Sequence, residues 1–240
     1  MSRDGIHKTM MVWGYDKRPA NGSAFVYYGI LPVEPDSPEA RILIPYTRRV
    51  LDAIGIKNGP THGEVIMTAD GPCLVEMNCR ANGGDGAWQP LARAMTGGYT
   101  QVDVAVDSYV DGRQFTITPD VPRPPLKAAG QEVKLVSFAR GRVKATPGFD
   151  KIRSLQSFVY METGVAPGIQ VEYTIDLVTC VGGAVLVHSD PEILEADVKC
   201  IRDMEKNNEL FEFEELGVMF KSNSKSDFTQ YYDTDRADQL

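Results

Sequence analysis

Two glutamates on either side of a tight turn are the residues of this sequence best placed to do chemistry. Glu64 lies in the apolar run 63–68 and Glu76 lies in the run 72–78, and the Asp70-Gly71 pair between them is typical of a β-hairpin turn. In an antiparallel pair centred on that turn, residues whose numbers sum to about 140 face each other. We therefore expect the two carboxylates to be cross-strand neighbours.

The residues that follow Glu76 add further ligand types to the same face. Side chains alternate along a strand, so Asn78 and Arg80 are expected to point the same way as Glu76. Paired carboxylates with an amide oxygen form the hard oxygen set that Mg²⁺ prefers. An arginine suits phosphate or a developing oxyanion, and Gly83-Gly84 allows the backbone to approach a ligand closely.

A plainer interpretation of the same residues stays open. The two glutamates could lie on a solvated face, with Arg80 as an ion-pair partner of little energetic value. The apolar runs 65–67 and 73–75 instead predict that the strands are largely buried. Buried like charges repel each other unless a cation or an arginine compensates them. The residues alone leave both interpretations open.

Two neighbours of this stretch are weaker candidates for the same site. His62 precedes Glu64 by two residues, so it shares its strand face and could orient a substrate or support a metal ligand. A strand-end histidine with a satisfied hydrogen bond is equally expected. Asp85 follows the double glycine and could bind a substrate amine, although an exposed loop aspartate is the commoner case.

The elements that must position these residues follow from pattern and turn chemistry. Asn21-Gly22 predicts a hairpin turn between strands 6–15 and 24–31. Apolar spacing and helix-end signals predict helices at 46–54, 87–95 and 99–110. Four prolines in the seven residues 119–125 forbid regular structure, so we place a domain boundary there.

A second patterned segment follows the proline-rich stretch. Residues 134–139 and 142–146 flank Arg140-Gly141 and predict another hairpin, and Asp190-Pro191 predicts the first residues of a long helix. The residues from 221 to 240 are rich in Ser, Asp, Asn and Gln, which predicts a disordered tail.

Composition excludes several classes of protein. With 25 Lys and Arg against 33 Asp and Glu the net charge is −8, which argues against nucleic acid or an anionic membrane as partner. No apolar run approaches the ~20 residues of a membrane span, and the charged N-terminal segment is unlike a secretory signal. Four cysteines without a CxxC pair predict reduced thiols in a cytoplasmic protein.

The stretch 59–84, GPTHGEV…GPCLVEMNCRANGG, resembles the metal-binding strand pair of the ATP-grasp ligases, whose pattern is G-x-x-H-x-E…G-x-x-x-x-E-x-N-x-R-x-x-G-G. The run 12–29, VWGYDKRPANGSAFVYYG, is similar to a strand–turn–strand segment of that superfamily. Residues 165–179 and 185–205 resemble the appended subdomain of the L-amino-acid ligases, which make dipeptides and related amides. The resemblance covers about residues 6 to 220.

The resemblance implies an α+β fold. It implies the C-terminal lobe of an ATP-grasp domain over 1–115, a proline-rich linker over 116–125, an appended subdomain over 126–220 and a tail over 221–240.

The resemblance also implies roles for individual residues and partners. Glu64, Glu76 and Asn78 would bind Mg²⁺ or Mn²⁺, and Arg80 would contact the γ-phosphate of ATP and then the tetrahedral oxyanion. ATP would be the co-substrate, with a small carboxylate and an amine, both amino-acid-like, as the groups joined. Apart from the resemblance, the residues themselves offer four candidates for contact with the substrates: His62, Gly83, Gly84 and Asp85. A homodimer is compatible with the sequence.

One departure from the ligase pattern limits what this chain is expected to do. Complete ligases have an N-terminal domain and a lobe with ATP-binding lysines, both of which would precede Ser2. We therefore expect a chain that is inactive alone, with Lys8 and Lys17 as solvated strand-edge lysines. The alternative is a non-catalytic remnant that binds a protein partner through its tail and its acidic residues Glu205, Glu209, Glu212, Glu214 and Glu215.

Overall fold

The computed structural model describes residues 1–214, without the side chain of Asp85, and has an α+β architecture. The strands are β1 Ser2–Arg3, β2 Ile6–His7, β3 Trp13–Ala20, β4 Ser23–Pro32, β5 His62–Thr68, β6 Gly71–Asn78, β7 Ala129–Leu135, β8 Gly141–Ala145, β9 Phe158–Glu162, β10 Gln170–Val171, β11 Gly182–His188 and β12 Glu212–Phe213. The helices are α1 Pro38–Ala53, the 3₁₀ turn η1 Gly84–Gly86, α2 Trp88–Thr96, α3 Gln101–Val110, α4 Gly112–Ile117, α5 Pro147–Arg153 and α6 Pro191–Lys206.

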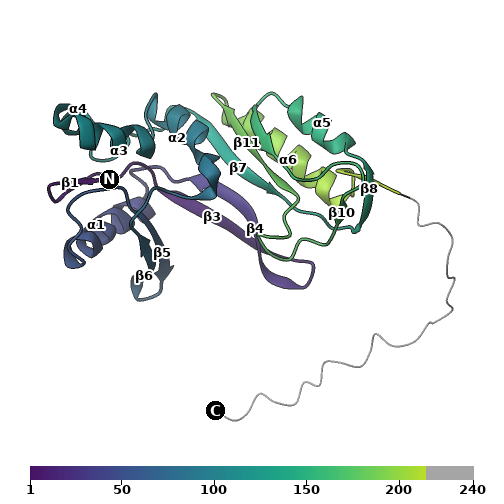
Figure 1. Cartoon of the computed structure of the whole chain (residues 1–240), viewed down its shortest axis with the longest axis horizontal. Coiled ribbons are helices and arrows are strands. Elements are labelled where there is room, and N and C mark those ends of the chain that lie inside the picture. Colours follow the sequence, from purple (N-terminus) through teal and green to yellow (C-terminus); the bar gives the residue numbers. More distant parts are fainter. Residues whose placement is uncertain (215–240) are drawn as a thin grey trace, which may run out of the picture.

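A five-stranded antiparallel sheet runs through the middle of the molecule in the order β3-β4-β7-β11-β9 (Figure 1). Successive side chains of a strand point to opposite faces, so each face buries a separate core. Val185 of β11 packs with Leu91 and Met95 of α2, whereas the next residue, Leu186, packs with Ile201 of α6. The sheet thus has α2 on one face and α6 on the other.

The join between β4 and β7 depends on a glycine. The two strands pair through Gly29 with Val133 and Ile30 with Glu132. Gly29 has a φ of +139°, and a Cβ atom built on it would lie 1.9 Å from the carbonyl oxygen of Glu132. Only a residue without a side chain allows this approach of the two backbones.

The hairpin β5–β6 forms a separate two-stranded sheet beside α1, near the N-terminal end of the chain (Figure 1). The hydroxyl of Tyr46 on α1 accepts a hydrogen bond of 2.9 Å from the backbone N–H of Leu74 on β6. The predicted turn at Asp70-Gly71 is present, and Gly71 has a φ of +111°. This hairpin carries the predicted site residues out to the edge of the large sheet.

Several predicted elements are confirmed and one hairpin is wrong. The strands on both sides of Asp70-Gly71 pair as predicted, and α2, α3 and α6 lie where the pattern placed helices. The chain also turns at Asn21-Gly22 as predicted, but the first strand of that hairpin is Trp13–Ala20 and not 6–15. Asp190 caps α6 by accepting from the N–H of Glu192. The predicted pairing of strands around Arg140-Gly141 is wrong, because β7 pairs with β4 and β11 while β8 pairs with β10 and β12.

The proline-rich segment 116–125 separates residues that share one sheet. Strands β3 and β4 precede it and β7, β9 and β11 follow it, so hydrogen-bonded pairing continues across the predicted boundary. The division into units at 1–115 and 126–220 stays a prediction. The predicted tail at 221–240 lies outside the described residues.

Within residues 1–214, no helix has the length and apolar character that crossing a membrane requires.

Candidate active site

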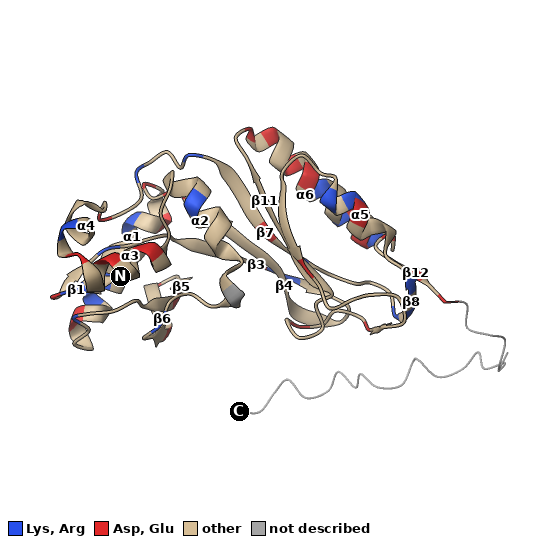
Figure 2. Ribbon diagram, turned by 45° about the horizontal axis from the view of Figure 1, so that its top comes forward, with Lys and Arg blue, Asp and Glu red and all other residues tan. Residues whose placement is uncertain are grey.

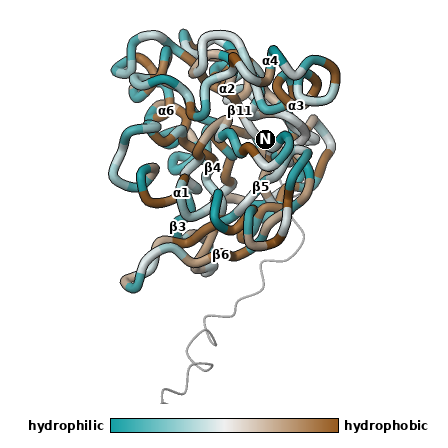
Figure 3. The backbone as a smooth tube through the Cα atoms, turned by 90° about the vertical axis from the view of Figure 1, so that its left-hand side faces the viewer, coloured by the Kyte–Doolittle hydropathy of each residue, from teal (hydrophilic) through white to brown (hydrophobic). Residues whose placement is uncertain are grey.

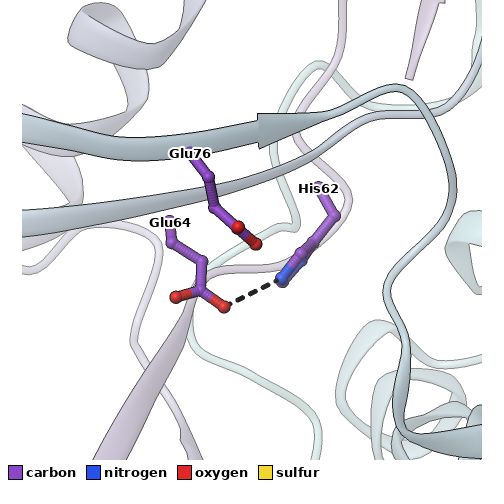
Figure 4. Close-up of side chains that lie close together, drawn as sticks. All are labelled: His62, Glu64 and Glu76. Atoms are coloured by element: carbon purple, nitrogen blue, oxygen red, sulfur yellow. Dashed lines mark ion pairs between the residues drawn. The ribbon is translucent and has the colours of Figure 1, made fainter.

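The two glutamates are directly opposite each other, as the hairpin arithmetic predicts. In the β5–β6 register Glu64 pairs with Glu76 and His62 pairs with Asn78, with a β-bulge just after Glu64. One ligand atom each from His62, Glu64 and Glu76 can be chosen so that all three lie within 4.8 Å of one another. Figure 4 shows these three side chains directed toward a common point beside the hairpin.

The polar groups of this cluster contact one another. The Nε2 atom of His62 lies 3.5 Å from Oε1 of Glu64, and the amide N–H of Asn78 donates to Oε1 of Glu76 at 2.6 Å. Glu64 and His62 are partly buried and Glu76 is exposed. For Asn78 to bind a cation, its amide would rotate so that the oxygen rather than the nitrogen faces Glu76.

A tyrosine that sequence reasoning missed holds one of the carboxylates. The hydroxyl of Tyr15 on β3 donates a hydrogen bond of 2.6 Å to Oε1 of Glu64. Burial, this hydrogen bond and the negative charge of Glu64 raise the pKa of Tyr15 far above its usual value, so its hydroxyl keeps the proton it donates. Tyr15 thereby connects the large sheet to the hairpin that carries the site.

The glycine loop after β6 is held from two sides. The buried indole of Trp88 donates from Nε1 to the carbonyl oxygen of Gly83 at 2.8 Å. The side chain of Gln101, also missed in the sequence, accepts from the N–H of Asn82 and donates to the carbonyl oxygen of Thr61, each at 2.9 Å. Gln101 therefore ties together the two chain segments at the open end of the hairpin, next to the cluster.

Arg80 lies beside this loop and does not neutralise the glutamates. Its Nη1 atom donates to the carbonyl oxygen of Ala81 at 2.9 Å. A Cβ atom built on Gly83 would lie 3.5 Å from the same Nη1 atom. Among the side chains that the structure describes in residues 1–214, which leave out Asp85, no carboxylate lies within 4.0 Å of the Arg80 guanidinium. The plain ion-pair interpretation of Arg80 therefore finds no partner among these described side chains.

Some expectations about burial are wrong. Ile66 is 59% exposed and Val75 is 54% exposed, although the hairpin contains hydrophobic residues, drawn brown along β6 in Figure 3. The hairpin forms a sheet of its own, so these side chains are not covered by the large sheet. Lys8 is buried rather than solvated, and its ammonium donates to the carbonyl oxygens of Thr116 and Thr118. The side chain of Asp85 lies outside the described part of the structure.

The donor set of the cluster fits a divalent cation. Glu64 and Glu76 approach each other as two negative charges, and Asn78 can add an amide oxygen from the same strand face. Hard divalent cations take such oxygen donors and usually complete their coordination with water and substrate phosphates. Within the described residues this is the only cluster of three or more acidic, histidine or cysteine side chains at ligand distance.

The chain is similar to known synthases and ligases, in sequence to one and in fold to others. The chain is 27% identical to dapdiamide A synthase of Enterobacter agglomerans over 168 residues, which is 68% of this chain. Its fold matches that of an L-amino acid ligase from Bacillus licheniformis with a TM-score of 0.67 at 17% identity over 84% of this chain. It also matches a phosphoribosylglycinamide synthetase from Anaerococcus prevotii with a TM-score of 0.59 at 12% identity over 80% of this chain.

The matches cover only part of each relative. The chain spans 38% of the length of dapdiamide A synthase, 50% of the L-amino acid ligase and 47% of the phosphoribosylglycinamide synthetase. No protein-family model matches the chain. The predicted resemblance to ATP-grasp ligases and the predicted α+β fold class are both confirmed.

Proposed function

We propose that this chain supplies the cation- and oxyanion-binding residues of an ATP- and Mg²⁺-dependent ligase that joins a carboxylate to an amine, both from amino-acid-like substrates. The observation that carries the proposal is the pairing of Glu64 with Glu76, whose carboxylates lie within ligand distance of each other and of His62. The similarity to dapdiamide A synthase and the fold of an L-amino acid ligase support an amide or peptide bond as the product.

The proposed reaction has two steps. A carboxylate oxygen of the first substrate attacks the γ-phosphorus of ATP, ADP leaves and an acyl phosphate forms. The amine nitrogen of the second substrate then attacks the acyl carbon, the amine loses a proton and phosphate leaves with the electron pair of the broken C–O bond. Mg²⁺, when bound, neutralises charge on the phosphates, and phosphoryl transfer depends mainly on such neutralisation and on positioning.

Residues of this chain have distinct tasks in that scheme. Glu64, Glu76 and Asn78 hold the cation, and the Arg80 guanidinium binds the transferred phosphoryl group and then the oxyanion of the acyl carbon. The backbone of Gly83 lies beside Arg80, and the space around Gly84 is open, so this loop allows close approach of a substrate. We propose that the residues around this loop, namely His62, Gly83, Gly84 and Asp85, contact the amino-acid-like substrates.

A non-catalytic module that binds partners through acidic residues is less well supported. Glu205 of the proposed acidic surface is buried against Arg202, and Glu212 and Glu214 form ion pairs with Lys144 and Arg142. Lys and Arg also lie among the acidic residues of α5 and α6 (Figure 2). The described acidic side chains therefore do not form a free surface of one charge.

The cation site is tested by Glu76→Gln. This change removes one charged ligand at nearly constant shape, so the affinity for Mg²⁺ and Mn²⁺ is expected to fall about tenfold or more. Titration calorimetry with Mn²⁺ measures the loss. Glu162→Gln is the matched control, because Glu162 is an exposed strand glutamate on β9, away from the cluster. Equal Mn²⁺ affinity in Glu76→Gln and the parent protein would refute the two-carboxylate site.

The proposal also predicts weak binding of nucleotide by these 240 residues alone. The described site offers cation ligands and Arg80 but no lysine pair for the α- and β-phosphates of ATP, because Lys8 is engaged by backbone carbonyls and Lys17, over the Tyr15 ring, is a single lysine. We expect a millimolar dissociation constant for ATP with Mg²⁺, about −4 kcal/mol of binding free energy. Calorimetry gives the value. A micromolar dissociation constant would mean that this chain carries a complete nucleotide site.

A further inference from the structure

We propose that His62 is a further ligand of the cation, so that the site combines an imidazole nitrogen with the oxygens of Glu64, Glu76 and Asn78 and prefers Mn²⁺ to Mg²⁺. The inference rests on the proposed cation site and specifies which ion that site selects. It goes beyond the roles of substrate contact or support of a ligand that the sequence suggested for His62.

The position of His62 on the hairpin is that of a ligand. It is the first residue of β5, it pairs with Asn78, and it shares a strand face with Glu64 two residues later. Its ring nitrogen lies within 4.8 Å of a ligand atom of each glutamate. Ligand atoms on opposite sides of one ion are about 4.2 Å apart at ordinary bond lengths, so small side-chain rotations bring all three onto one cation.

The ring of His62 has one polar contact among the side chains that the structure describes. Its side chain is only 16% exposed, and this contact is the 3.5 Å approach to Glu64. The other two histidines are satisfied. His7 lies 2.7 Å from the Ser2 hydroxyl and 3.1 Å from Asp52, and His188 accepts from the backbone N–H of Asp190 at 2.9 Å. His62 is therefore the histidine whose ring nitrogen faces the carboxylates and makes no hydrogen bond to another described side chain (Figure 4).

The hydrogen bond from Tyr15 engages one carboxylate oxygen of the cluster and leaves the others for a cation beside the His62 nitrogen. Tyr15 donates to Oε1 of Glu64, the same oxygen that faces His62, which fixes the orientation of that carboxylate. The second oxygen of Glu64 and both oxygens of Glu76 are acceptors that a cation can use. A site with one nitrogen and two carboxylates differs from the all-oxygen set typical of Mg²⁺.

The identity of the donors predicts the selectivity. Mg²⁺ strongly prefers oxygen ligands, whereas first-row transition ions accept imidazole nitrogen as well. Loss of the imidazole should therefore lower the affinity of the site for a transition ion much more than its affinity for Mg²⁺. Mn²⁺ is the suitable probe, because it favours oxygen and nitrogen over thiolate ligands and so avoids the exposed thiols of Cys73 and Cys79.

The experiment compares Mn²⁺ and Mg²⁺ binding in four proteins by titration calorimetry: the parent, His62→Gln, Glu76→Gln and His188→Gln. His62→Gln is expected to lower Mn²⁺ affinity about tenfold or more, with less than a twofold change for Mg²⁺. His188→Gln, the control at the far end of β11, should match the parent for both ions. Electron spin echo spectra of the bound Mn²⁺ should show a nitrogen coupling that His62→Gln removes.

A labelled parent protein makes the test independent of substitution. Incorporating ¹⁵N-histidine should convert the nitrogen coupling from the ¹⁴N to the ¹⁵N pattern without altering the fold. Two results would overturn the inference while Glu76→Gln still lowers the affinity for both ions. One is equal Mn²⁺ affinity in His62→Gln and the parent protein, and the other is a Mn²⁺ spectrum without nitrogen coupling. Failure of the cation site itself would look different, because Glu76→Gln would then leave Mn²⁺ affinity unchanged.

Discussion

Replacing Arg80 with lysine is expected to lower kcat for amide formation about 10²-fold in an active ligase that contains these residues. Lysine keeps the positive charge but loses the planar fork that binds two oxygens at once. Arg80 has no ion-pair partner among the described side chains, which leave out Asp85, and its guanidinium donates to the carbonyl oxygen of Ala81. The rate of ADP release with ATP, Mg²⁺ and saturating amino acids measures the effect.

A control variant tests whether an arginine-to-lysine change far from the site also lowers kcat. Arg113→Lys changes a 93% exposed side chain that pairs with Asp111 at the start of α4, remote from the glycine loop, and should leave kcat unchanged. Both variants should unfold at the same temperature as the parent. Full turnover in Arg80→Lys would return this arginine to the status of an ordinary surface residue.

Removing Arg202 is expected to cost about 3–5 kcal/mol of unfolding free energy, because it leaves a buried carboxylate without its counter-charge. The Arg202 guanidinium donates to both oxygens of Glu205 at 2.8 Å and to the carbonyl oxygens of Lys134 and Tyr28 at 2.9 and 2.6 Å. It also lies 4.7 Å from the ring centre of Tyr28. These bonds connect α6 to β4 and β7. Urea unfolding of Arg202→Ala measures the loss.

A second pair with the same three-residue spacing provides the control. Asp150 and Arg153 on α5 form a solvent-exposed ion pair, so Arg153→Ala should change the unfolding free energy by less than about 1 kcal/mol. If Arg202→Ala is no more destabilised than Arg153→Ala, the buried pair does not support the fold.

The same variant should show a pH dependence of defined sign. Burial raises the pKa of Glu205, while the charge and hydrogen bonds of Arg202 act in the opposite direction. Without Arg202 the folded-state pKa rises further above the unfolded value. A carboxyl group with a raised folded pKa gains a proton on folding, so its cost is relieved as the pH falls. The destabilisation of Arg202→Ala should therefore be larger at pH 8 than at pH 5.

The part of the site that could be predicted is the part fixed by local chain geometry. The Asp70-Gly71 turn determines which residues of β5 and β6 pair, so Glu64 opposite Glu76 follows from counting. Strand alternation then places Asn78 and His62 near them. The start of α6 at Asp190-Pro191 is equally local, since a capping side chain and a proline act within one turn.

The contacts that could not be predicted join residues far apart in the chain. Tyr15 and Glu64 are separated by 49 positions, and no spacing rule brings β3 onto β5. The pairing of β7 with β4 rather than with β8 is decided by tertiary packing, which a local turn signal at Arg140-Gly141 does not contain. Burial of the hairpin was misjudged for a related reason, because apolar residues predict a buried face only where another element covers it.

The glycine at the β4–β7 join has a consequence for recombination between related genes. The two halves of the large sheet meet where Gly29 approaches the Glu132 carbonyl, at a point where a methyl group would overlap that oxygen. A chimera that takes its first hundred residues from one parent and the remainder from another keeps the β4–β7 pairing only if the parent of the first part has glycine at position 29. Crossovers in the proline-rich stretch are thus constrained by a residue that lies roughly ninety positions upstream.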